Sequence, residues 1–273
     1  MNFTKILFFI LSITVLNSGI LFSQIDGTSH TNTSLDQRLR IGEEFTYLVK
    51  YAFLNLGEVR IKVYAKEKLT GKTIYKTIAY IDSYEGLPFV DMHQIYESWI
   101  DSNLCPVFFQ ALIFSDEDTS YTKYFFKDDN KVHVLRGKLN KEKPWVDTVV
   151  TLGKKYQDGL SLLYFARFGF VKRENSIIPT YVNEDTSTTM VNYYKRKEKI
   201  SIDALGYDID CVRLDGRTNF TGIFGLTGYF EGWFSNDESY IPITADLQVI
   251  LGDVTAELIN WNKKKWQPPA YNK

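Results

Sequence analysis

The feature that most constrains this fold is a two-residue period of apolar side chains, repeated in successive segments of the chain. Residues 45–52 and 58–66 alternate in this way, and a turn signal that ends in Gly57 separates them. Successive side chains of a strand point to opposite faces, so this period indicates strands with one buried face. A third such segment, residues 73–83, extends the pattern to an antiparallel meander.

The strand pattern continues almost to the end of the chain, where aromatic and β-branched residues are frequent. Aromatic residues make up 15% of the sequence, which favours strands. Further strand-like segments cover residues 93–100, 107–114, 121–126, 132–135, 146–152, 177–182, 188–202, 207–214, 219–234, and the hairpin 247–251 and 254–259. We therefore predict a mainly β fold of long curved antiparallel sheets, open or half-barrel, in one domain at 41–261. Two packed sub-sheets dividing near 153–176 are the alternative arrangement.

One short helix is predicted near residues 159–168. Asp158 is a good N-cap, and Gly169 is a typical end. Leu163, Tyr164 and Phe168 follow at helical spacing and give the helix an apolar face. Ser161 beside Asp158 invites a hydrolytic interpretation, but it has no G-x-S-x-G surround and no nearby histidine. Capping and packing explain these residues better.

The N-terminus has the pattern of a secretory signal peptide. Lys5 precedes an apolar run at 6–16, and small and polar residues follow. The alternative is a membrane anchor, but the run is shorter than the roughly 20 residues that a spanning helix needs. We predict cleavage after a signal at 1–23, export to the periplasm and no integral span in the mature chain. No cysteine lies near the cleavage point, so the protein is not expected to be a lipoprotein.

The segments that flank the predicted domain lack an apolar period. Residues 24–40 are predicted to be a disordered leader, and residues 262–273 a loose tail. Removal of the signal takes away Lys5 and no acid, which leaves 31 basic and 33 acidic residues. Such nearly equal numbers of basic and acidic residues give no positive electrostatic potential that would attract a nucleic-acid backbone.

The two cysteines, Cys105 and Cys211, lie far apart in the sequence. An oxidising compartment permits a disulfide between them, and two separate buried thiols fit the sequence equally well. There is no C-x-x-C pattern and the histidines are scattered, so neither a metal site nor a cofactor is predicted.

The stretch at 219–243 combines glycines, aromatics and a proline. Its glycines either curve the sheet or let a ligand or neighbour approach the backbone. Asp237 is assigned to the turn that follows the aromatic strand. Pro242 predicts an edge or a bulge in the next strand.

Several blocks of the chain match one bacterial family. They are G-E-E-F-T-Y-L-V-K-Y at 42–51, the segment 96–106, D-G-L-S-L-L-Y-F-A-R at 158–167, and W-F-S-N-D-E-S-Y-I-P-I at 233–243 followed by Leu251 and Gly252. The chain resembles DUF3108, a family of exported β-rich proteins of unknown function. The resemblance implies a periplasmic β-rich protein, and the family has no assigned catalytic residues that could be carried over to this chain. Its long curved sheets with one helix are also similar to half-barrel carriers of lipids or lipoproteins, by analogy of fold alone.

Three functions from different classes follow. The first is a non-catalytic carrier of an apolar ligand such as a lipid, with a pocket wall formed by Leu163, Tyr164, Phe168, Phe224 and Trp233. The alternative for these aromatics is that they fill a core. The second is an envelope assembly factor that contacts a protein partner at sheet edges, with Pro242 and the lysine-rich segment 194–199 as edge devices. The third, a hydrolase, has no visible nucleophile and base, so we expect no enzyme.

Overall fold

The computed structural model describes residues 35, 39–87, 90–171, 174–250 and 252–272, together with the backbone but not the side chain of Phe224. The chain divides into two units, Met1–Asn32 and Thr33–Lys273, and only the second contains described residues. The predicted signal peptide and most of the predicted leader therefore lie outside the described residues. Within the second unit the described elements are fourteen strands, one α-helix and one 3₁₀ turn, η1 (Ile223–Gly225).

Every strand pairs antiparallel with its neighbours in one continuous sheet. The strands are β1 (Glu44–Tyr51), β2 (Leu54–Leu69), β3 (Lys72–Ser83), β4 (His93–Asp101), β5 (Pro106–Phe114), β6 (Thr119–Phe126), β7 (Lys131–Lys138), β8 (Val146–Thr151), β9 (Ser176–Val182), β10 (Asp185–Ile200), β11 (Ile209–Thr218), β12 (Leu226–Ser235), β13 (Pro242–Val249) and β14 (Gly252–Asn262). The predicted mainly β class is confirmed.

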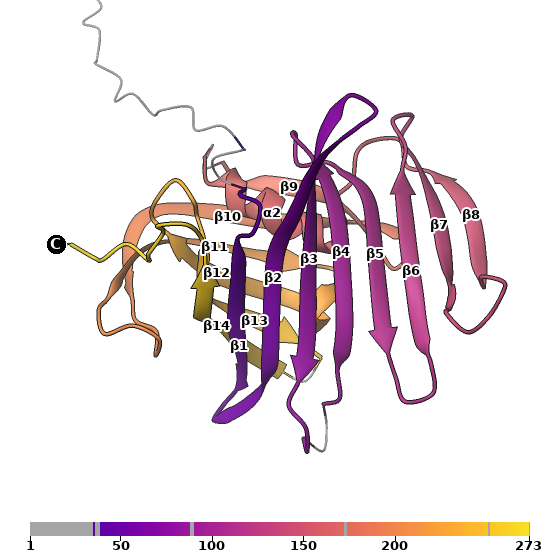
Figure 1. The fold of residues 1–273 in the computed structure, drawn as a ribbon. Coiled ribbons are helices and arrows are strands. Elements are labelled where there is room, and N and C mark those ends of the chain that lie inside the picture. The colour runs from indigo at the N-terminus through magenta and orange to yellow at the C-terminus, as the bar shows by residue number, and fades with distance from the viewer. Residues whose placement is uncertain (1–34, 36–38, 88–89, 172–173, 251, 273) are drawn as a thin grey trace, which may run out of the picture. The chain divides into compact units, whose positions relative to one another are not determined.

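The strand order explains how one sheet acquires two halves. It runs β8-β7-β6-β5-β4-β3-β2-β1-β14-β13-β12-β11-β10-β9, so the pairing of β1 with β14 joins an N-terminal half to a C-terminal half. Figure 1 shows that strands of the two halves run in clearly different directions. Strand β1 has a bulge at Thr46/Tyr47 in its pairing with β14 and another at Val49/Lys50 in its pairing with β2, and bulges increase local twist. The sheet is not closed, because its end strands β8 and β9 have no pairing with each other among the described residues.

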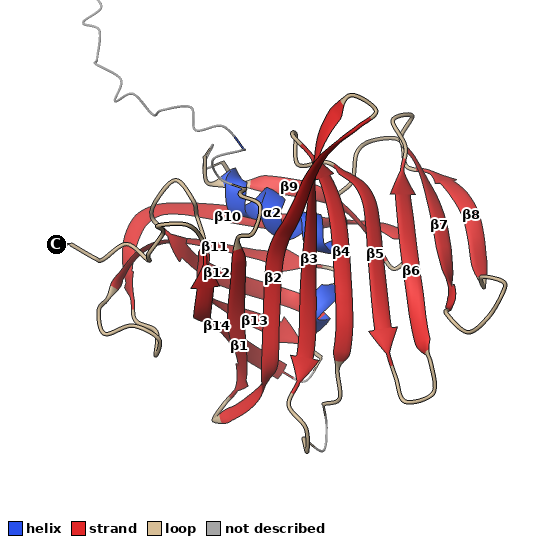
Figure 2. Ribbon diagram, viewed as in Figure 1, coloured by secondary structure: helices blue, strands red, loops and turns tan. Residues whose placement is uncertain are grey.

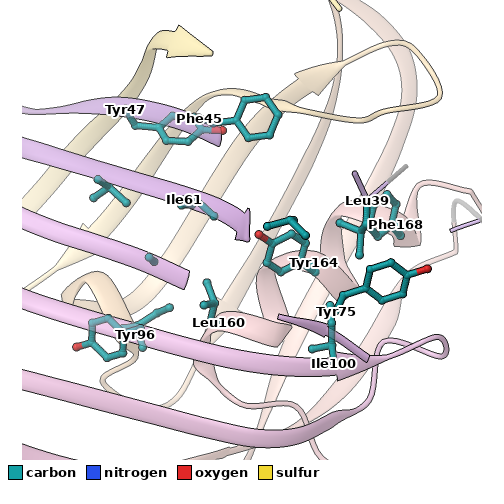
Figure 3. Packing of buried hydrophobic residues seen from close by; sticks show 14 of the residues in the cluster. Leu39, Phe45, Tyr47, Ile61, Tyr75, Tyr96, Ile100, Leu160, Tyr164 and Phe168 are labelled. Carbon is teal, nitrogen blue, oxygen red and sulfur yellow. The ribbon is translucent and has the colours of Figure 1, made fainter. Parts of the chain in front are cut away.

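Helix α2 (Gly159–Gly169) lies between the two halves, as Figure 2 shows. One face carries Leu160, Tyr164 and Phe168 into a core shared with the N-terminal strands, which is visible in Figure 3. The opposite face carries Ala166 into a second cluster with the C-terminal strands, and Phe170, which follows the helix, joins it there. A helix that is apolar on both sides is typical of a buried element. The predicted helix and its Asp158 cap are confirmed, since the Asp158 carboxylate accepts hydrogen bonds from two backbone N–H groups of the first turn.

The C-terminal tail is not loose, so that prediction is wrong. Trp266 is buried, and its ring packs edge-on against Phe45 and Trp261. Beyond it, the carbonyl of Pro269 accepts a hydrogen bond from the Asp210 backbone, and Ala270 forms a bridge with Ile209. One tryptophan and backbone hydrogen bonds are enough to anchor the tail. Its sequence therefore shows no apolar period that would indicate an ordered segment.

The predicted disordered leader also ends earlier than expected. Leu39 is only 2% exposed and belongs to the main core, and Leu35 packs against the same core. Two leucines in a polar segment give too little periodicity to be recognised from sequence.

The two expected edge positions differ in the structure. Pro242 is at a bulge, where Phe234 pairs with it, but β13 runs between β12 and β14. The segment 194–199 belongs to β10, and β9 pairs with β10 only over 185–191, so these residues pair with β11 alone. The bulge prediction for Pro242 is confirmed and its edge role is wrong, whereas the segment 194–199 does lie at an unpaired margin of the sheet.

The cysteines are separate free thiols in the structure. Cys105 lies in the turn between β4 and β5 of the N-terminal half, and Cys211 is buried in β11 of the other half. The disulfide alternative is therefore not realised here, and the two-thiol alternative is.

Candidate functional site

An apolar cavity of about 250 Å³ lies between the two halves of the sheet and is partly open to the surface. Strands β1, β2 and β3 line it on one side, β10 to β14 on the other, and helix α2 covers part of it. Nearly all of the lining is apolar. Apolar pockets of this kind are the usual binding sites of small hydrophobic ligands.

A row of short side chains runs along the cavity wall. Gly232 of β12 pairs with Ala245 of β13, Ala245 pairs with Ala256 of β14, and all three line the cavity. The row continues through Val49 to Gly57, because Val49 pairs with both Ala256 and Gly57. Paired residues share a face of the sheet, so five adjacent strands present short side chains side by side.

Gly57 shows why one of these positions must be small. A Cβ atom there would lie 2.2 Å from the backbone oxygen of Asp82 on β3. The structure thus requires glycine for the close approach of β2 and β3, and Gly57 also lines the cavity.

The helix supplies the remaining wall. Leu162, Leu163 and Ala166 line the cavity, as does Gly159 in the first turn. A Cβ atom at Gly159 would lie 2.7 Å from the side chain of Ile223, so the helix start is packed directly against η1.

Polar groups at the cavity margin are already partnered. The Tyr47 hydroxyl donates to the carbonyl of Pro242 at 3.1 Å. Glu58 accepts from the Tyr84 hydroxyl at 2.9 Å, and Glu231 forms an ion pair with Arg213 at 2.9 Å. The cavity therefore offers burial of apolar surface as its main means of holding a ligand.

A cluster of buried charges lies beside Tyr47. The Glu43 carboxylate accepts Arg167 at 3.2 Å and Lys263 at 2.5 Å, and all three side chains are at most 3% exposed. Arg167 also donates from Nε to the carbonyl of Ser239, while its Nη2 has no hydrogen-bond partner. Burial lowers the pKa of Lys263. It raises the pKa of Tyr47 at the margin of this cluster.

A second buried carboxylate caps the helix. Asp158 accepts hydrogen bonds from Ser98 and from the first helical turn, and burial raises its pKa to about 6. Ser161 donates back to the Asp158 carbonyl and accepts from its N–H. These bonds account for the serine and the aspartate as a capping box, which leaves no base to activate Ser161. Over the described part of the chain, no cluster of histidine, cysteine, aspartate and glutamate could hold a metal ion.

The structure separates the five residues predicted to line a pocket. Leu163 lines the cavity, whereas Tyr164 and Phe168 lie in the adjoining core. The indole of Trp233 donates to Glu198, and its neighbours Gly232 and Phe234 line the cavity instead. The Phe224 side chain lies outside the described residues.

The turn assignment of Asp237 is confirmed. Its carboxylate accepts hydrogen bonds from the backbones of Ser239 and Tyr240 and from the Ser235 hydroxyl. Its other oxygen accepts from the indole of Trp266, so the turn also anchors the C-terminal tail.

Sequence reasoning missed the alanines of the small-residue row and assigned Gly57 to a turn. The available signal was the occurrence of small residues at inward positions of alternating strands, as at Ala245 and Ala256. That signal becomes specific only when the strands are placed side by side.

The fold and the cavity define a class of protein: an open antiparallel β-sheet wrapped around a helix and an apolar cavity. The chain belongs to the family described as "Protein of unknown function (DUF3108)", whose model matches residues 46–259. This confirms the family resemblance drawn from the sequence. None of the curated proteins is significantly similar to the chain.

Three solved structures are similar to the chain at very low identity. A β-barrel-like protein of the DUF1849 family from Brucella abortus is 11% identical, with a TM-score of 0.49 over 86% of this chain and all of that one. A Bacteroides fragilis protein assigned as exported, with a YmcC-like fold, is 9% identical, with a TM-score of 0.35 over 82% of this chain and 97% of that one. A Parabacteroides distasonis protein assigned as a lipoprotein is 7% identical, with a TM-score of 0.37 over 82% and 96%. Within the described residues, no helix is both long enough and apolar enough to cross a membrane.

Proposed function

We propose that this protein is exported to the periplasm and binds an apolar ligand, such as a lipid acyl chain, without catalysing a reaction. The observation that carries the proposal is the cavity, whose wall is kept open by Gly57, Gly232, Ala245 and Ala256. Its volume of about 250 Å³ exceeds the roughly 150 Å³ of an apolar cavity that takes up benzene. An unbranched chain fits the chemistry of the wall, because few polar groups there need a partner.

The proposal is tested with a polyene fatty acid whose fluorescence rises in apolar surroundings. The wild-type chain is expected to bind it saturably. Ala256→Phe, which fills the cavity, is expected to weaken binding at least tenfold. Thr255→Phe is the matched control, because Thr255 lies on the same strand but is not part of the cavity wall. Circular dichroism establishes that each variant is folded.

Absence of saturable binding, or equal binding by folded Ala256→Phe, would refute the carrier function. Native mass spectrometry of the chain isolated gently from cells provides an independent measurement, with a co-purified lipid expected for the wild type. Cleavage of residues 1–23 and recovery in the periplasmic fraction test the export step.

One observation favours a second function, envelope assembly through protein contacts at a sheet edge. Strand β8 is an end strand of the open sheet, and Val149 and the preceding Trp145 are more than half exposed. Exposed apolar edge strands can pair with a strand of another protein. A photo-crosslinker at position 149 that captures one specific protein in cells, while the same group at position 177 does not, would support this function. Equal, nonspecific labelling from both positions would contradict it.

A further inference from the structure

Two hairpin turns carry the most exposed large apolar side chains among the described residues. Phe53, between β1 and β2, is 91% exposed, and Ile250, between β13 and β14, is 75% exposed. Each extends beyond the last paired residues of its hairpin, Tyr51 with Leu54 and Val249 with Gly252. Neither position contributes to a core, so their apolar character is unexplained by folding.

The two turns are neighbours in space. Strands β1 and β14 pair antiparallel up to Lys50 and Thr255. β1 ends one residue later at Tyr51, two residues before Phe53, and β14 begins at Gly252, two residues after Ile250. A Cβ atom at Gly252 would lie 3.1 Å from the ring of Tyr51, which confirms that the two hairpins are in contact at this end of the sheet.

Both turns lie at the rim of the apolar cavity. Its lining includes Leu56 just after the first turn, and Val249 and Val254 on either side of the second. Val90 and Met92, from the connection between β3 and β4, line the cavity at the same end. At the opposite end the lining reaches Tyr47, Ile61 and Pro242. An entrance at the hairpin turns would lie away from the buried charges of Glu43 and Arg167.

The charges at this rim determine which kind of lipid or protein surface it can bind. The described residues 51–59, 84–87, 90–92, 249–250 and 252–254 contain four acids, Glu58, Glu85, Asp91 and Asp253, and no lysine or arginine. An acidic rim is repelled by anionic lipids and by phosphate, but it tolerates zwitterionic head groups. Two separate projecting side chains also differ from the continuous patch of roughly 800 Å² per partner that a stable protein interface needs.

We propose that Phe53 and Ile250 dock the protein on a zwitterionic lipid surface, with the mouth of the cavity facing the bilayer. This inference rests on the proposed function, since the docked position matters for a ligand that moves between bilayer and cavity. Two apolar side chains without basic residues give a weak, reversible contact. Such a contact allows the loaded protein to leave the membrane.

The test measures the transfer of the polyene fatty acid from phosphatidylcholine vesicles to the full chain. In Phe53→Ser/Ile250→Ser, transfer is expected to slow at least tenfold, while binding of the same probe from solution keeps wild-type affinity. Ile177→Ser is the matched control, because Ile177 is 70% exposed on strand β9 and is not part of the rim. Its transfer rate is expected to equal that of the wild type.

Contact with the bilayer is measured separately from ligand binding. In Phe53→Trp, phosphatidylcholine with brominated acyl chains is expected to quench the additional tryptophan emission, and added phosphatidylglycerol is expected to weaken that quenching. Wild-type transfer by the double variant, no quenching, or stronger docking on anionic vesicles would each overturn the inference. If no chain binds the probe from solution but Phe53→Trp is quenched, the carrier function fails and the docking surface stands.

Discussion

The space between the two sheet halves has two ends that are built from different chemistry. At one end Glu43, Arg167 and Lys263 bury three charges against one another. At the other end small apolar residues line a cavity that reaches the β1–β2 and β13–β14 hairpins. Helix α2 spans both, with Gly159 at the cavity and Arg167 in the charged cluster.

The comparison shows how one open sheet can be rigid and still have room inside. The charged end is held by interactions that lose much of their energy if one partner is removed. The apolar end has few such interactions, so its walls can accept a ligand without breaking hydrogen bonds. The following variants are expected to separate the two ends, from the largest effect to the smallest.

Glu43→Gln is expected to lower the free energy of unfolding by about 3–5 kcal/mol, because it leaves two buried cations without their shared anion. Urea denaturation of this variant and of Glu44→Gln provides the measurement. Glu44 is the matched control, since its ion pair with Lys62 is partly exposed and is worth about 1 kcal/mol or less. Equal effects of the two substitutions would show that the buried cluster does not hold the closed end together.

Trp266→Ala is expected to cost about 3 kcal/mol, because a buried indole and its contacts with Phe45 and Trp261 are lost. Amide exchange in residues 263–271 should accelerate at the same time. Trp145→Ala, at a position that is 56% exposed, is expected to change stability by less than about 0.5 kcal/mol. Unchanged exchange in the variant would contradict the role of Trp266 as the anchor of the tail.

The Asp158 carboxyl is expected to make stability fall as pH rises. Burial raises its pKa to about 6 in the folded protein, above roughly 3.9 in an unfolded chain. The folded state therefore binds more protons between these values, and its stability declines by about 2 kcal/mol from pH 4 to pH 6. Asp158→Asn keeps a good N-cap and should flatten this decline. A difference between variant and wild type that is independent of pH would contradict the assignment.

Two alanine-to-phenylalanine substitutions compare the filled core with the empty cavity. Ala79→Phe, at a fully buried position of the core, is expected to cost about 1–3 kcal/mol by overpacking. Ala256→Phe, in the cavity wall, is expected to change stability by less than about 1 kcal/mol, because empty volume receives the ring. Thermal or urea unfolding of both variants makes the comparison. An equal loss at the two sites would mean that the cavity is not free volume.

Local patterns predicted the elements well. The alternation in 45–52, 58–66 and 73–83 corresponds to β1, β2 and β3, and the predicted helix near 159–168 is Gly159–Gly169. These patterns depend on neighbours a few residues apart, which a single sequence displays directly.

The candidate site was less accessible to sequence reasoning. Trp233 is the most prominent aromatic of its segment, yet its indole meets Glu198 and the inconspicuous Gly232 beside it lines the cavity. Aromatic content draws attention to side chains that fill space, whereas a cavity is formed by side chains that leave it unfilled. Alternation indicates which residues share a face, but it does not say which face encloses the free volume.

The sequence by itself determined the strands, the capped helix and the family, because short-range periods and motifs indicate each of them. Only the tertiary structure decided that β1 pairs with β14, that Lys263 and Arg167 meet Glu43, and that Gly57 and Ala256 share one cavity wall. The physical reason is that these contacts join residues more than a hundred positions apart. The energies of these contacts depend on how the two halves of the sheet pack, and a local sequence pattern contains no information about that packing.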